Sequence, residues 1–345
     1  MPPKRTTGCC RARRAVTESR PVEPDPDHAG ARDWLQGKGC GRLCGARLFL
    51  REAAGRPAVR ETRGMDGTRT NTIRRPAALT VAGSDSGGNA GIQADLRAFH
   101  VFGVHGCTAI AALTAQNPWG VNAVLPVDPD FLGQQLDAVL PHYAIGAAKT
   151  GMLATAGLIA VVAERFARYP ELLKVVDPVM IATSGARLLE PNAVAVLCER
   201  LLPLATLITP NLPEAEALLG RPIRGLAAAA GAARELHGRF GCAVLVKGGH
   251  DAAHCACDVL CDDEGTVMLE SPTVDQPLST HGTGCSLSAA ITAALACGSS
   301  LRDAVIAGKA YVYEAIRTGV WVGSRAAVLG TPARMPVEGI TRRAL

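Results

Sequence analysis

One segment of the chain, THGTGCSLSAA at residues 280–290, places a thiol beside a glycine-broken loop that runs into a helix-forming stretch. Gly282 and Gly284 let the backbone turn so that successive N–H groups point into one concavity, and the N-terminus of the next helix favours an anion there. Cys285 lies at the junction, where a helix N-terminus lowers the pKa of a thiol. The segment predicts an anion cradle with a catalytic thiol. The alternative is a glycine turn before an ordinary helix, with Cys285 a small buried apolar residue.

A second glycine-rich segment follows an apolar run. Residues 77–82 (AALTVA) are typical of a buried strand. They are followed by the glycine-rich stretch GSDSGGNAGIQADLRAF at residues 83–99. Five further motifs follow: ALTAQN (112–117), AAKTGML (147–153), VVDPVM (175–180), ITPNLPEAEALLG (208–220) and LVKGGH (245–250). Ligands of open α/β sheets bind beyond the carboxyl ends of the strands, so these motifs can converge on one cleft.

Taken in their order along the chain and with their spacing, these seven segments resemble the hydroxymethylpyrimidine and phosphomethylpyrimidine kinases of thiamine biosynthesis, members of the ribokinase-like superfamily. The resemblance covers about residues 76–320. It implies an enzyme that uses ATP and Mg²⁺ to phosphorylate an aminopyrimidine, 4-amino-5-hydroxymethyl-2-methylpyrimidine, its monophosphate, or both. Such a transfer needs positioning, a metal, an anion hole and a base for the hydroxyl proton.

The resemblance assigns the reacting centre to the first segment. Cys285 stands where sugar-kinase relatives carry the aspartate of a GAGD motif, so it is expected to be the catalytic base. The backbone amides of Gly282, Thr283 and Gly284 are expected to stabilise charge on the transferring phosphoryl group.

The metal and nucleotide side is expected around an NxxE pattern formed by Asn211 and Glu214. Carboxylate and amide oxygens suit Mg²⁺, which is usually held through water and substrate phosphates, so the resemblance places Glu214 and Asp177 at the metal and Asn211 at the nucleotide. The alternatives are a helix N-cap at Asn211 and a structural turn at Asp177. Lys247 ends an apolar strand, where its charge needs a partner: a nucleotide phosphate, or alternatively an internal ion pair.

The acceptor side centres on Gln116, whose amide offers one donor side and one acceptor side. This pattern matches a ring nitrogen and an exocyclic amine of an aminopyrimidine, and the resemblance makes Gln116 the residue that reads the pyrimidine. The backbone of Gly83 with Met152 and Val179 would complete the pocket, although Met152 and Val179 also fit an ordinary core.

Other functions share parts of this pattern. Pyridoxal or pyridoxine kinases can use the same scaffold and HGxGC loop, but those of this subtype carry methionine in place of Gln116, and a sugar kinase would carry aspartate at position 285. A non-catalytic pyrimidine or nucleotide sensor is the third alternative. The sequence departs from relatives at Asn89, where they usually have glycine, and at residues 322–336, which replace a GPxxH-type ending near the nucleotide. Asp85 is expected to orient the GSDSGG turn, and Asp95 to be structural.

Alternating elements must position these motifs. Strands are predicted at residues 77–82, 107–113, 145–149, 174–177, 205–209 and 243–247, and helices at 92–101, 131–140, 155–169, 191–201, 226–239, 286–297 and 301–318. This order predicts an α/β fold of the ribokinase-like type, with a mostly parallel central sheet and helices on both faces. Residues 258–261 and 266–270 flank DDEG and predict a hairpin at the sheet edge.

Composition narrows the classes of function. The chain is 48% hydrophobic and 19% charged and has no apolar run of the roughly 20 residues needed to span a bilayer, so no membrane partner is predicted. Residues 1–75 carry 17 Lys and Arg against 8 Asp and Glu, whereas the remainder carries 19 against 23; the basic excess therefore lies outside the enzyme and predicts no nucleic-acid surface. Twelve cysteines in a long chain of this composition favour reduced thiols in a cytoplasmic enzyme. A homodimer is the assembly that we expect.

The first part of the sequence differs from the rest. Residues 1–72 are rich in Arg, Gly and Pro without a helix or strand period, and they are predicted to be a disordered basic extension before a kinase domain at 73–345. Met65 stands shortly before the first predicted core strand and is a candidate alternative start; a genuine basic tail is the competing interpretation. A form beginning at Met65 is expected to fold and to keep its activity.

Overall fold

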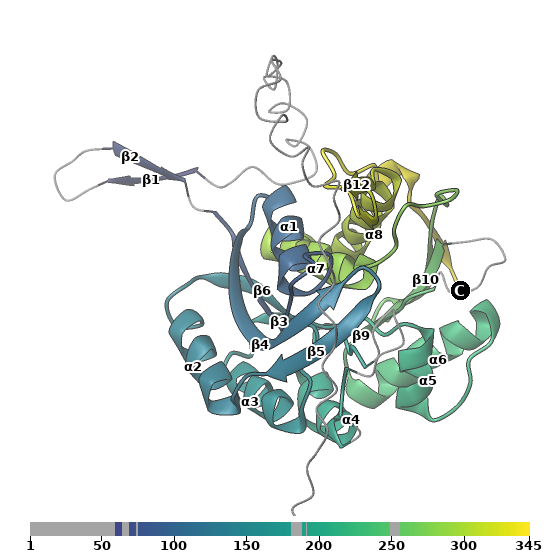
Figure 1. Cartoon of the computed structure of the whole chain (residues 1–345), viewed down its shortest axis with the longest axis horizontal. Helices are drawn as coiled ribbons and strands as arrows, with labels where there is room; N and C mark the ends of the chain where they lie inside the picture. Colours follow the sequence, from purple (N-terminus) through teal and green to yellow (C-terminus); the bar gives the residue numbers. More distant parts are fainter. Residues whose placement is uncertain (1–58, 64–68, 74, 181–187, 191, 249–255) are drawn as a thin grey trace, which may run out of the picture. The chain divides into compact units, whose positions relative to one another are not determined.

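A ten-stranded sheet organises the described part of the chain in the computed structural model, which covers residues 59–63, 69–73, 75–180, 188–190, 192–248 and 256–345 (Figure 1). Its strand order is β14-β11-β10-β9-β8-β7-β6-β3-β4-β5. The six central strands pair in parallel: β3 (Ala77–Asp85), β4 (His105–Asn117), β6 (Ile145–Thr150), β7 (Leu173–Val176), β8 (Leu207–Ile208) and β9 (Ala243–Val246). The outer strands pair antiparallel: β5 (Gly120–Pro126), β10 (Ala256–Asp262), β11 (Gly265–Ser271) and β14 (Thr341–Ala344).

Helices cover both faces of this sheet (Figure 1). One face carries α2 (Pro129–Val139), α3 (Ala156–Ala167), α4 (Ala193–Val196) with the π-helical turn Leu197–Leu201, α5 (Leu212–Leu219) and α6 (Gly225–Phe240), whose apolar side chains form one core with the strands. The other carries α1 (Gly91–Val101), α7 (Thr283–Ala296) and α8 (Leu301–Arg317), which form a second core. The parallel strands are buried on both faces, which explains why they read as continuous apolar runs.

Local signals fix where several helices begin. Asp128 caps α2 by accepting hydrogen bonds from the backbone N–H groups of Asp130 (2.9 Å) and Phe131 (3.2 Å), and Pro129 occupies the first helical position. Thr155 caps α3 and Ser300 caps α8 in the same manner. By contrast, α1 and α7 begin without a side-chain cap, so the N–H groups of their first turns are available to other partners.

The predicted fold class is confirmed: the structure is α/β, with the mostly parallel central sheet and helices on both faces. One expectation about the sheet is wrong. The β10–β11 hairpin does not form the edge, because β14 pairs with β11 beyond it. The short strands β5 and β14 and the separate pair β12 (Val320–Val322) and β13 (Ala326–Val328) were not predicted, because few buried side chains mark them in the sequence.

The range predicted to be a disordered extension needs a partial correction. Two short strands, β1 (Val59–Arg63) and β2 (Arg69–Ile73), pair antiparallel at its end, so the expectation of no regular structure is wrong for the nine strand residues that lie within 1–72. The rest of residues 1–72 lies outside the described residues, and so does Met65. In the part of the chain that the structure describes, no helix is both long and apolar enough to cross a bilayer.

Candidate active site

A cleft opens at the carboxyl ends of the parallel strands, where the motifs predicted from the sequence come together. Its volume is about 810 Å³ when the open mouth is included, within the range of small-molecule sites. Eleven of the twelve predicted site residues line it: Gly83, Gln116, Met152, Asp177, Val179, Asn211, Glu214, Lys247, Gly282, Gly284 and Cys285. The exception is Thr283, whose backbone N–H and side-chain hydroxyl both donate to the carbonyl of Thr280, at 3.4 and 2.9 Å. Its amide therefore stabilises the loop turn in this structure instead of facing the cleft.

The loop before α7 is built around Gly282. This residue is the N-cap of α7 and has a φ of 89°, a left-handed conformation that favours glycine. A β-carbon at this position would lie 2.0 Å from the carbonyl oxygen of Asn89, so the loop before α1 packs directly on the loop before α7. The two uncapped helix N-termini consequently meet at the same wall of the cleft, a geometry suited to an anion.

Cys285 lies in the first turn of α7, on the side that faces the start of α1. The backbone N–H of Gly91, the first residue of α1, donates a hydrogen bond toward its sulfur. Burial nevertheless raises the pKa of the Cys285 thiol to about 11, and the positive charge of Lys149 only partly offsets this effect. The expectation of a lowered thiol pKa is therefore wrong for the unliganded protein, because desolvation outweighs the helix N-terminus.

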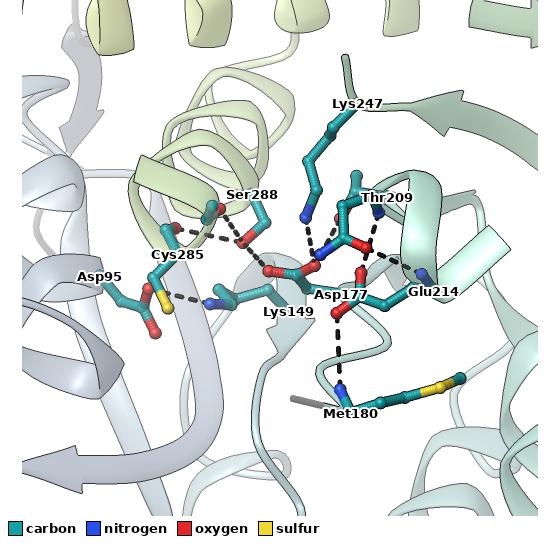
Figure 2. A network of polar contacts seen from close by, with 11 residues as sticks. Asp95, Lys149, Asp177, Met180, Thr209, Glu214, Lys247, Cys285 and Ser288 are labelled. Atoms are coloured by element: carbon teal, nitrogen blue, oxygen red, sulfur yellow. Dashed lines mark hydrogen bonds and ion pairs between the residues drawn. The ribbon is translucent and has the colours of Figure 1, made fainter. Parts of the chain in front are cut away.

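Three charged groups lie on the side of the cleft formed by β7, β9 and α5. Lys247 forms an ion pair with Asp177, with 2.8 Å between Nζ and Oδ1, which is the internal pair that the sequence analysis held as the alternative to a phosphate (Figure 2). Thr209 and Ser288 also donate to the Asp177 carboxylate, at 3.2 and 3.4 Å. Asp177 thus already pairs with a lysine. Within the described ranges Glu214 accepts only backbone N–H groups, from Asn211 at 2.9 Å and from Met180 at 3.4 Å, so it has no cation partner at hydrogen-bond distance there and is the stronger candidate for a metal ligand.

Glu214 sits in a capping box at the start of α5. Its carboxylate accepts from the backbone N–H of Asn211 at 2.9 Å, while the Asn211 side chain accepts from the backbone N–H of Glu214 at 2.8 Å. The N-cap alternative for Asn211 is therefore realised. Burial raises the pKa of Glu214 to about 7, with Lys247 opposing and Asp177 reinforcing the shift. A carboxylate kept partly neutral in this way would gain its charge when a cation binds.

The cleft offers few protein ligands to a magnesium ion. Among the described residues no group of three or more His, Cys, Asp or Glu side chains could hold a metal by itself. Mg²⁺ commonly uses one or two carboxylates together with water and phosphate oxygens, and Glu214 at the cleft wall fits that kind of site.

The opposite end of the cleft carries Gln116. Register shifts occur in the pairing of β3 with β4 at Gly83 and in that of β4 with β5 at Gln116, and such irregularities re-aim side chains near functional sites. The Gln116 amide nitrogen lies 3.2 Å from Nε2 of His281, and its oxygen is 3.3 Å from the hydroxyl of Thr114. Burial lowers the pKa of His281, which favours the neutral ring that can accept the amide proton.

The floor beside Gln116 is tightly packed. A β-carbon on Gly83 would meet the methyl carbon of Met152 at 2.6 Å, so Met152 lies against the Gly83 backbone as expected for one pocket. Asp85 orients the neighbouring turn: its carboxylate accepts from the backbone N–H groups of Gly87, Asn89 and Ala90, each at 2.8 Å. Asn89 is thereby integrated into the loop at the position where relatives have glycine.

Three polar residues near the reacting centre were given no chemical role from the sequence: Lys149, Asp95 and His281. Lys149 ends an apolar strand in the same manner as Lys247, so the argument that singled out Lys247 applied equally to it. His281 precedes the cradle glycines directly. Asp95 gave no signal, because a single aspartate on a helix face usually points to solvent.

The comparisons with known proteins agree with this geometry. The Phosphomethylpyrimidine kinase family model matches residues 85–329. A hydroxymethylpyrimidine/phosphomethylpyrimidine kinase of Rhizobium meliloti is 48% identical over 240 residues, which are 69% of this chain and 90% of that protein. The thiamine biosynthesis bifunctional protein ThiED of Geobacter sulfurreducens is 46% identical over 243 residues, 70% of this chain but only 49% of that longer protein.

Solved structures give the same result. An ADP complex of Bacillus subtilis pyridoxal kinase matches with a TM-score of 0.70 and 37% identity, covering 75% of this chain and 98% of that one. A phosphomethylpyrimidine kinase from Clostridium difficile 630 matches with a TM-score of 0.63 and 38% identity, covering 70% and 100%. The fold is thus that of a ribokinase-like small-molecule kinase. The chain belongs to the phosphomethylpyrimidine kinase family, which confirms the predicted family and enzyme class.

Proposed function

We propose that this chain transfers the γ-phosphoryl group of ATP to 4-amino-5-hydroxymethyl-2-methylpyrimidine, to its monophosphate, or to both, and so supplies the pyrimidine pyrophosphate for thiamine synthesis. The observation that carries the proposal is the Gln116 amide, held by His281 and Thr114 in the same cleft as Cys285, in a member of this family. An amide fixed at both ends can pair with the ring nitrogen and exocyclic amine of an aminopyrimidine.

In this proposal each residue has a defined task. The Cys285 sulfur accepts the proton of the substrate hydroxyl as its oxygen attacks the γ-phosphorus, and the bond from phosphorus to ADP breaks. The amides of Gly282 and Gly284, at the uncapped start of α7, stabilise charge on the transferring group. Lys247 exchanges Asp177 for a nucleotide phosphate. Glu214 would hold Mg²⁺ through its water shell, and the ion would neutralise the developing phosphate charge. ATP as donor is supported by the ADP complex of the pyridoxal kinase neighbour.

The test is an ATP-consumption assay with the purified full chain. The aminopyrimidine alcohol, its monophosphate and pyridoxal are offered in parallel with Mg-ATP. We expect at least one pyrimidine to be phosphorylated with a kcat/KM well above that for pyridoxal. Pyridoxal is the meaningful competitor because a pyridoxal kinase shares the fold with 37% identity. Faster turnover of pyridoxal than of both pyrimidines would replace the proposed substrate.

The substitution Glu214→Gln is expected to have two separately measurable effects, one on the pH dependence of stability and one on the magnesium requirement. The unfolded glutamate has a pKa near 4.5, whereas the folded value is about 7, so the folded state binds more protons between these values and wild-type stability falls as the pH rises through that window. Glutamine keeps a capping-box side chain and carries no charge. We expect the variant to be more stable than wild type at pH 8, by at most about 3 kcal/mol, and to differ little near pH 4.5.

The same variant should need a higher Mg²⁺ concentration for half-maximal activity. Urea unfolding at the two pH values and a magnesium titration of turnover measure both effects. Glu235→Gln, at a half-exposed glutamate of α6, is the matched control and should change neither. Equal stability differences at both pH values would mean that Glu214 is not the group whose burial sets the pH dependence.

We propose further that the protein is a homodimer formed through the β4–β5 hairpin. Strand β5 is the sheet edge, and large apolar side chains are exposed on this hairpin: Leu113, Trp119, Val124 and Leu125. An open edge with exposed apolar residues is usually covered in a native assembly. Leu125→Asp should shift the sedimentation profile toward the monomer, whereas Val322→Asp, in another exposed apolar strand, should not. A wild-type protein that sediments as a monomer at micromolar concentration would refute the dimer.

We place the protein in the cytoplasm. The described cysteines, among them Cys285 and the buried Cys107 and Cys242, are free thiols, as expected in a reducing compartment.

A further inference from the structure

A second lysine is buried directly beneath the cleft. The Lys149 and Asp95 side chains have no exposed surface, and Nζ of Lys149 lies 2.9 Å from Oδ1 of Asp95. The other carboxylate oxygen of Asp95 accepts from the hydroxyl of Thr80 at 2.6 Å. Burial disfavours the charge of Lys149, but the negative charges of Asp95, Cys285 and Asp177, with the hydrogen bond to Asp95, together outweigh it and raise the pKa of Lys149, so this lysine carries a positive charge. A fully buried ion pair is costly to desolvate and is by itself weak evidence for a stabilising role.

The pair lies beside Cys285, whose thiolate takes the substrate proton in the proposed function. Figure 2 shows the Cys285 side chain directed toward the Lys149–Asp95 pair, with α7, α1 and β6 supplying one residue each. A β-carbon on Gly151, which lines the cleft, would lie 3.5 Å from Nζ of Lys149, so the ammonium is next to a residue of the cleft wall.

The charges that face Cys285 come from four elements. Lys149 at the end of β6 favours the thiolate, whereas Asp95 on α1 and Asp177 after β7 oppose it, and Lys247 after β9 interacts with it favourably. Lys247 already has Asp177 as its direct partner at 2.8 Å. It also faces the proposed phosphate position, so a bound nucleotide would draw its charge away from the sulfur. Lys149 is fully enclosed and has no such competing ligand.

We propose that Lys149 is the positioning residue that makes the Cys285 thiolate easier to form, so that its sulfur can take the proton of the substrate hydroxyl, with Asp95 setting the position and strength of the positive charge of Lys149. The inference rests on the proposed function for the role of Cys285 as base and for the identity of the hydroxyl. During the transfer the O–H bond of the substrate breaks and an S–H bond forms, while phosphorus gains the substrate oxygen and loses the ADP oxygen. Lys149 keeps its proton throughout. The thiol then returns its proton to solvent after the product leaves.

The experiment measures the thiol without substrate, so its failure and the failure of the proposed function are distinguishable. The rate of iodoacetamide alkylation at Cys285 is followed against pH by mass spectrometry of its peptide, in wild type, Lys149→Met, Asp95→Asn and the double variant. Lys149→Met should alkylate at least tenfold more slowly at pH 8, with its profile displaced to higher pH. Asp95→Asn should alkylate faster, because the opposing charge is removed.

Lys149→Met and Asp95→Asn are thus expected to change the alkylation rate of Cys285 in opposite directions. If the two residues had only a structural role, both substitutions would change that rate in the same direction. The double variant removes both buried charges and should fold even if Lys149→Met does not; we expect it to alkylate more slowly than wild type. Lys309→Met breaks another buried pair, with Asp258 at 2.7 Å, and should leave Cys285 alkylation unchanged. Equal alkylation profiles in wild type and the double variant, or the same displacement in Lys309→Met, would overturn the proposal.

Discussion

Replacing Cys285 with alanine is expected to lower kcat by about 100-fold or more while leaving nucleotide and pyrimidine binding nearly unchanged. The size follows from the usual contribution of a positioned general base, about 10²–10⁴-fold. Binding should survive because the anion cradle consists of backbone amides at the uncapped start of α7, and alanine retains them. Steady-state kinetics with the preferred pyrimidine, together with calorimetric titration of ADP, measures both quantities.

Cys297→Ala is the matched control for this prediction. Cys297 caps the other end of α7, where its sulfur contacts the carbonyl of Phe102 and faces no cleft residue. The control should keep wild-type kcat. A Cys285→Ala variant that retains more than half of wild-type turnover would remove the thiol from the mechanism and leave water or a phosphate oxygen as the proton acceptor.

Gly282→Ala is expected to abolish activity and to destabilise the protein. An alanine there would need the left-handed backbone with a φ of 89°, which costs about 1–2 kcal/mol. Its β-carbon would also lie 2.0 Å from the carbonyl oxygen of Asn89, a distance that real contacts do not reach. The loops before α1 and α7 must then separate, and the amides that form the cradle lose their common orientation. Thermal unfolding and steady-state kinetics report the two consequences.

Gly298 offers a control with the same backbone. Its φ is also 89°, but a β-carbon there would meet no atom within 4 Å. Gly298→Ala should therefore show only the backbone cost and retain its activity. If the two variants lose equal stability and both remain active, the packing of the two loops contributes nothing and the cradle tolerates their separation.

The sequence predicted the central strands because burial on both faces leaves a strong signal. The continuous run at β3 is an example, since every residue from Ala77 to Gly83 is buried. Even the two-residue strand β8 was located, because the polar motif after it marked its end. The edge strands β5 and β14 escaped, since residues with one solvated face and few apolar positions look like loops until a partner strand is known.

The properties of the site residues also divide into those that the sequence predicted and those that it did not. Residues whose type already implies a role, such as Gln116 and Cys285, were placed in the cleft that the structure describes. Properties that depend on neighbours from distant segments were not foreseen. The thiol pKa of Cys285 depends on burial between α1, β6 and α7, and the commitment of Lys247 to Asp177 depends on two strand ends that lie 70 residues apart. Such effects are set by tertiary packing, which local patterns do not encode.

The burial of the helix that follows the proposed anion cradle has a consequence for its dynamics. Every residue from Ser286 to Leu295 is buried, and α8 approaches so closely at Gly308 that an added β-carbon would lie 2.6 Å from a side-chain carbon of Ile291. In hydrogen-exchange terms, these amides should open only with global unfolding. In the proposed function the start of this helix presents the phosphoryl-binding amides, so its rigidity would keep them oriented without a conformational change in α7.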